Sequence, residues 1–72
     1  MIHFARLDHS PRLQRTLDFL RQCGNRGATT MEIIRGANVC AINSIAAELR
    51  HNGYIVRCEN QGKIFRYFLE GN

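Results

Sequence analysis

Basic side chains are the residues of this 72-residue chain that point most directly to a ligand. Nine arginines and one lysine outnumber six acidic residues, which leaves a net charge of +4. The arginine guanidinium is a planar fork of donors suited to phosphates and guanine edges. A small basic domain therefore favours nucleic acid as the partner. The alternative is that the positive charge serves only to keep the protein soluble.

Cysteine and histidine, the usual metal ligands and nucleophiles, are dispersed along the chain. The cysteines are odd in number, and neither a CxxC motif nor a Cys-His cluster is present. This pattern argues against a zinc site or a cofactor and predicts buried, reduced thiols in a cytoplasmic protein. Cys40 has two interpretations, a small partly buried residue or a redox-sensitive thiol at a helix N-terminus.

Enzyme chemistry is not indicated by the sequence. It contains no Ser-His-Asp or Cys-His arrangement, no paired carboxylates and no glycine-rich phosphate loop. A chain this short has little room for a deep cleft beside a supporting core. The sequence also has no apolar run long enough for a signal peptide or a membrane span. We therefore expect neither a small-molecule substrate nor a membrane partner.

Three helices are predicted from spacing and caps. Ser10-Pro11 is typical of a helix start, and an apolar face with period 3.6 follows until Gly24 and Gly27. Thr29-Thr30-Met31-Glu32 fits a capping box, and Gly36-Ala37-Asn38 ends that second helix. A third helix is expected over residues 40–52. The predicted apolar positions are Leu13, Thr16, Leu17, Leu20, then Thr30, Ile33, Ile34, Ala37, then Ile42, Ile45, Ala46 and Leu49.

The two later helices, joined by a short turn, match a helix-turn-helix arrangement. The outward face of the third helix would then carry Cys40, Asn43, Ser44, Ala47 and His51, with Arg50 at its flank. Small polar side chains would let this helix sit deep in a major groove. The alternative is an ordinary solvated helix face, since the surface holds few positive charges.

A β-hairpin is predicted over residues 54–69, where side chains alternate on both sides of an expected turn at Asn60-Gln61-Gly62. Its inner face would hold Tyr54, Val56, Cys58, Phe65, Tyr67 and Leu69. Arg57 and Arg66 would share the outer face, with Lys63 near the tip. Such basic residues could grip the phosphates that flank a groove.

Residues 11–69 resemble the small winged helix-turn-helix domains of bacteria, phages and prophages. The resemblance is carried by TTMEI at 29–33, AELRHNGY at 47–54 and FRYFL at 65–69. It implies an α+β fold, with a three-helix core followed by a β-hairpin wing, and a DNA-binding transcriptional regulator without catalytic residues. Similar domains often carry an arginine shortly before the ELR segment, where this chain has Ser44-Ile45-Ala46-Ala47.

The resulting hypothesis is a domain over residues 10–70, preceded by an arm at residues 1–9, that binds double-stranded DNA. The expected DNA-binding residues are Arg35, Asn43, Ser44, Ala47, Arg50, His51, Arg57, Lys63 and Arg66. The alternative function is protein–protein interaction without DNA binding, through an exposed apolar patch such as Ile55 with Phe68. A homodimer could form through the apolar arm or the outer hairpin face.

Overall fold

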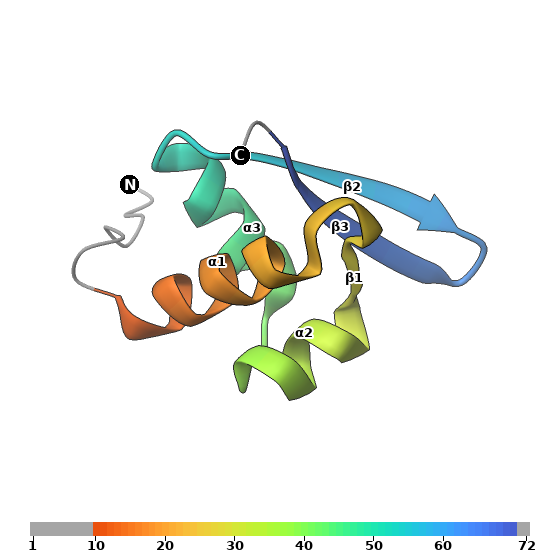
Figure 1. Ribbon diagram of the computed structural model, residues 1–72, viewed down its shortest axis with the longest axis horizontal. Helices are drawn as coiled ribbons and strands as arrows, with labels where there is room; N and C mark the ends of the chain where they lie inside the picture. Colours follow the sequence, from red (N-terminus) through yellow and green to blue (C-terminus); the bar gives the residue numbers. More distant parts are fainter. Residues whose placement is uncertain (1–9, 71–72) are drawn as a thin grey trace.

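The computed structural model describes residues 10–70 as an α+β fold in which three helices are followed by a C-terminal β-hairpin (Figure 1). The elements are α1 (Pro11–Cys23), the 3₁₀ turn η2 (Gly24–Arg26), β1 (Ala28–Thr29), α2 (Thr30–Ala37), α3 (Ile42–His51), β2 (Ile55–Gln61) and β3 (Ile64–Glu70). The α+β class and the order of three helices followed by a hairpin agree with the prediction. The expected arm at residues 1–9 lies outside the described residues.

Helix α1 begins at Pro11, where the missing proline N–H costs no hydrogen bond. Ser10 occupies the N-cap position, but its side chain makes no capping hydrogen bond, so its predicted capping role is wrong. The four predicted apolar-face positions of α1 are all buried, and the helix ends at Gly24 in a positive-φ conformation. α1 is therefore the central core helix, packed against both α2 and α3.

Helix α2 is short and is fixed at both ends by local hydrogen bonds. The Thr29 hydroxyl accepts from the Glu32 N–H, and the Glu32 carboxylate accepts from the Thr29 N–H at 2.9 Å, which is the predicted capping box. At the other end Asn38 adopts the left-handed conformation with φ 56°. Arg15 of α1 also donates to the Ala37 carbonyl oxygen at 3.0 Å. The position of α2 on α1 is thus set by backbone as well as apolar contacts.

Helix α3 begins at Ile42, later than the expected start at residue 40. Ala41 sits at the N-cap with φ 55°, a left-handed conformation that alanine rarely adopts, and no side chain caps the helix. The helix begins later than expected because Asn38 and Ala41, at the two ends of the α2–α3 turn, adopt left-handed conformations that change the chain direction between the helices. All four predicted inward residues of α3 are buried, so its predicted inner face is confirmed.

The strands form one antiparallel sheet in the order β1-β3-β2. Gln61 pairs with Ile64, so the hairpin loop is Gly62-Lys63 and the predicted turn at Asn60-Gln61-Gly62 is wrong. Gly62 has φ 76°, as the first position of a two-residue type II′ loop requires. The predicted faces are nevertheless correct, because Arg57 pairs with Phe68 while Cys58 pairs with Tyr67 on the opposite side.

The core lies between the three helices and the inner face of the sheet. Val56 and Tyr67 are the buried residues of the hairpin, and they join the leucines and isoleucines of the helices. Figure 1 shows the hairpin continuing past the helices, so its tip stands clear of the core. None of the helices within residues 10–70 combines the length and apolar character that a bilayer crossing requires.

Candidate nucleic-acid interface

The outward face of α3 is small and polar in its first turn. Asn43, Ser44 and His51 are exposed, and Ala47 is half-buried. This face follows from the 3.6-residue period, because the buried isoleucines and leucine occupy the opposite stripe. A helix whose outward side chains are short in its first turn can approach another surface closely at that end.

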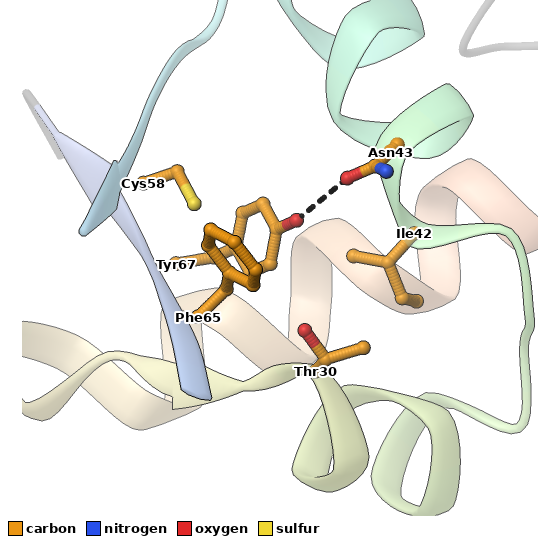
Figure 2. Close-up of a pocket in the computed structure, with 6 residues that line it drawn as sticks. All are labelled: Thr30, Ile42, Asn43, Cys58, Phe65 and Tyr67. Carbon is orange, nitrogen blue, oxygen red and sulfur yellow. Dashed lines mark hydrogen bonds between the residues drawn. The ribbon is translucent and has the colours of Figure 1, made fainter. Parts of the chain in front are cut away.

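A cleft of about 420 Å³ separates the first turn of α3 from the inner face of the hairpin. We call it the α3–hairpin cleft, and Figure 2 shows its lining: Thr30, Ile42, Asn43, Cys58, Phe65 and Tyr67. The N-terminus of α2 contributes the threonine, so α2, α3, β2 and β3 all meet there. The cleft exists because the hairpin extends beyond the core, which leaves inner-face residues such as Cys58 exposed.

One hydrogen bond crosses the α3–hairpin cleft. The Tyr67 hydroxyl donates to Asn43 Oδ1 at 3.0 Å, which ties the centre of β3 to the first turn of α3 (Figure 2). Burial raises the pKa of the Tyr67 phenol, and the neighbouring Cys58 thiol raises it further. The phenol therefore stays protonated, and remains a donor, at ordinary pH.

Arg50, an expected phosphate-binding residue, is held against the protein backbone. Its Nε and Nη2 both donate to the Val56 carbonyl oxygen, at 2.9 and 2.7 Å. This contact joins the last turn of α3 to the second residue of β2. Arg50 thus fixes the angle between the helix and the hairpin.

Replacing Arg50 by alanine should therefore lower the free energy of unfolding, by about 1 kcal/mol, because the Val56 carbonyl loses a charged donor pair. Urea unfolding measures the change. Arg35→Ala is the control, since Arg35 is exposed, and it should change stability by less than about 0.5 kcal/mol. Equal losses in the two variants would contradict a structural role for Arg50.

The two hairpin arginines lie on the outer face of the sheet, away from α3. Arg57 pairs with Glu59 and Glu70 and stacks over the Phe68 ring at 4.1 Å. Arg66 donates to the Arg26 carbonyl oxygen at 3.2 Å and lies 3.8 Å from Glu32. We call this group the outer ionic cluster, and its members are Arg26, Glu32, Arg57, Glu59, Arg66 and Glu70.

The outer ionic cluster holds three arginines and three glutamates, so its positive charge is locally balanced. The hydrogen bond from the Thr29 N–H lowers the pKa of Glu32, and Arg26 and Arg66 lower it further. That carboxyl therefore stays ionised beside both arginines. Exposed pairs of this kind add little stability but do occupy the guanidinium groups.

Across residues 10–70 every acidic side chain has an arginine partner, and the remaining positive charge rests on four residues. These four are Arg15, Arg35, Arg50 and Lys63. Arg15 and Arg50 donate to backbone carbonyls. Arg35 in the last turn of α2 and Lys63 in the hairpin loop are the exposed cations left for an external anion.

Apolar side chains surround Lys63 at the hairpin tip. Met31, Ile64 and Phe65 are all about half exposed and line a second hollow of about 360 Å³ with the start of α2. Phe65 also lines the α3–hairpin cleft, so the two hollows adjoin. One side of the molecule thus carries, in order, the first turn of α3, the cleft, and the hairpin tip.

The predicted site residues therefore divide between two surfaces instead of forming one. Asn43, Ser44, Ala47 and His51 lie on α3, and Lys63 stands at the hairpin tip. Arg57 and Arg66 lie on the opposite face of the sheet, within the outer ionic cluster. Arg57 and Arg66 therefore do not share a surface with Asn43, because successive side chains of a strand point to opposite faces.

Sequence reasoning missed Tyr67 and Thr30 as residues that line the cleft. Tyr67 was assigned only to the core, and no local pattern links it to a residue 24 positions away. The cysteines also differ from expectation, since only Cys23 is buried while Cys40 and Cys58 are exposed. Cys40 precedes α3 in the exposed turn, and Cys58 faces the open part of the cleft.

No cluster of three or more His, Cys, Asp or Glu side chains that could hold a metal ion occurs within residues 10–70. No protein-family model, curated protein or solved structure matches this chain.

Proposed function

We propose that this chain is a winged helix-turn-helix protein that binds double-stranded DNA, as a small transcriptional regulator of bacterial or phage type. α2 and α3 would form the helix-turn-helix, and the β2–β3 hairpin would be the wing. The observation that carries the proposal is the exposed, small and polar first turn of α3 beside a projecting hairpin. In helix-turn-helix proteins the N-terminal residues of the second helix contact base edges.

In this proposal α3 enters the major groove, with Asn43 and Ser44 closest to the bases. Ala47 and His51 lie further along the same face, where a small residue permits close approach. The hairpin tip would rest on the adjacent backbone, so Lys63 would meet a phosphate. Arg35, in the last turn of α2, would contact the backbone that the first helix of such a motif crosses.

Arg57 and Arg66 already have carboxylate partners, which makes Arg35 and Lys63 the better candidates for phosphate binding. The glutamates beside Arg57 and Arg66 balance the charge of these guanidinium groups, so they attract a phosphate less strongly. Arg35 and Lys63 have no carboxylate partner within residues 10–70. They can therefore bind DNA without breaking an ion pair.

The proposal is tested by binding to fluorescent random-sequence duplex DNA across a salt series. The double variant Arg35→Ala/Lys63→Ala should flatten the log–log salt slope by about 1.8, since each lost phosphate contact removes about 0.9. Arg57→Ala/Arg66→Ala is the matched control, because it removes the same charge from the outer ionic cluster. Its slope should stay near that of the wild type. A folded wild type that binds no DNA at low salt would refute the proposal.

Protein interaction without DNA binding is the second candidate, and the exposed apolar side chains favour it. Ile55 is 63% exposed, and Met31, Ile64 and Phe65 stand open around the hairpin tip. Phe68, expected to join Ile55 in one patch, is half-buried with Arg57 over its ring. Sedimentation equilibrium would test self-association, and a concentration-dependent mass that Ile55→Asp abolishes would support a dimer through the outer hairpin face.

A further inference from the structure

The Tyr67–Asn43 hydrogen bond decides which group of the Asn43 amide faces outward. Asn43 is exposed at the second position of α3, whereas Tyr67 is only 5% exposed and is fixed in the core. Figure 2 shows Oδ1 directed at the tyrosine hydroxyl, with Nδ2 on the other side of the amide group. In this contact the hydroxyl donates and the amide oxygen accepts, so the amide nitrogen lies on the side away from Tyr67.

An asparagine amide can offer both a donor and an acceptor to DNA when it is free to turn. The usual result is a bidentate contact with adenine, in which Oδ1 accepts from N6 and Nδ2 donates to N7. That contact needs both amide atoms side by side at the groove. In this chain Oδ1 already accepts from Tyr67 and is directed into the α3–hairpin cleft, so Nδ2 is the amide group turned outward.

We propose that Tyr67 is a positioning residue that makes Asn43 a donor-only reader of the major groove. This inference rests on the proposed DNA-binding function. The base opposite Asn43 should then present acceptors alone, as guanine does with N7 and O6 or thymine does with O4. Adenine and cytosine place an amino group in the same region and are disfavoured. The hairpin thereby sets the base preference of the helix without touching that base.

The test is selection of bound duplexes from a random library, with four variants beside the wild type. Asn43→Ala identifies the contacted position, because preference there should disappear. At that position the wild type should select guanine or thymine. Tyr67→Phe frees the amide, and adenine should gain about fivefold or more over guanine, which is the discrimination expected of a bidentate pair. Tyr54→Phe, which removes the other tyrosine hydroxyl, should keep the wild-type preference.

Asn43→Asp provides a test that does not depend on the fold of the Tyr67 variant. Its outward atom becomes an acceptor, so the preference should invert toward cytosine or adenine. The inference is overturned if the wild type selects adenine at this position, or if Asn43→Asp or a folded Tyr67→Phe keeps the wild-type preference. A wild type that binds no duplex at all would instead remove the proposed function and this inference with it.

Discussion

Gly27→Ala is expected to destabilise the protein by about 3 kcal/mol, a large share of the roughly 5–15 kcal/mol typical of a folded domain. Gly27 has φ 67° and ψ −168°, a backbone conformation that only glycine adopts readily. An added Cβ would also lie 2.7 Å from the Tyr67 carbonyl oxygen and 2.6 Å from the Phe68 ring. The carbonyl cannot retreat, because Ala28 pairs with Tyr67 in the sheet.

Gly24→Ala separates the two causes of that loss. Gly24 belongs to the same turn and has φ 58°, but a Cβ there would meet nothing within 4 Å. The Gly24→Ala variant should therefore lose only about 1 kcal/mol of unfolding free energy, which is the backbone strain alone. Thermal and urea unfolding of both variants would measure the difference. Equal destabilisation would mean that the contact with β3 does not matter and that the turn conformation alone is responsible.

Leu49→Ala should cost about 3 kcal/mol, the middle of the range for a leucine truncated in a close-packed core. Leu49 is 0% exposed and lies on the inner face of α3, so its loss leaves a cavity among the helices. The neighbouring α3–β2 contact through Arg50 should survive, which would keep the secondary structure seen by circular dichroism. The expected result is a lower urea midpoint with an unchanged native spectrum.

Ile55→Ala is the matched control for the core variant. Ile55 is also a large aliphatic residue, but 63% of its surface is exposed. Its truncation should change the free energy of unfolding by less than about 0.5 kcal/mol. A loss comparable to that of Leu49→Ala would show that Ile55 is covered in solution, as it would be in a dimer through the outer hairpin face.

Local patterns were sufficient to predict most of the fold. The capping box at Thr29 and Glu32 involves residues three positions apart, and its hydrogen bonds need no tertiary contact. The alternation in residues 55–70 likewise determines which side chains share a face, whatever the turn. The turn itself was misplaced, because a glycine with positive φ fits either the last position of a three-residue loop or the first of a two-residue loop.

The candidate site was less predictable because its properties depend on distant partners. The sequence shows Arg57 as a basic residue, but its charge balance depends on Glu70, which the register places across the hairpin. Asn43 was recognised as an outward residue of α3, yet its orientation is set by Tyr67 from another element. Ala41 in the left-handed conformation has no propensity signal, so the delayed start of α3 could not be foreseen.

The sheet order leaves the hairpin with two open edges, which has a consequence for aggregation. β2 has a neighbour on one side only, and β1 covers just two residues of β3. Open edges can template strands from other molecules, and charged side chains oppose this. Arg57 and Glu59 protect β2, whereas the tip half of β3 presents Ile64 and Phe65 between Lys63 and Arg66, and the Arg66 side chain is turned toward Arg26 and Glu32. In concentrated solution, we therefore expect fibrillar assembly to begin at the tip half of β3 rather than along β2.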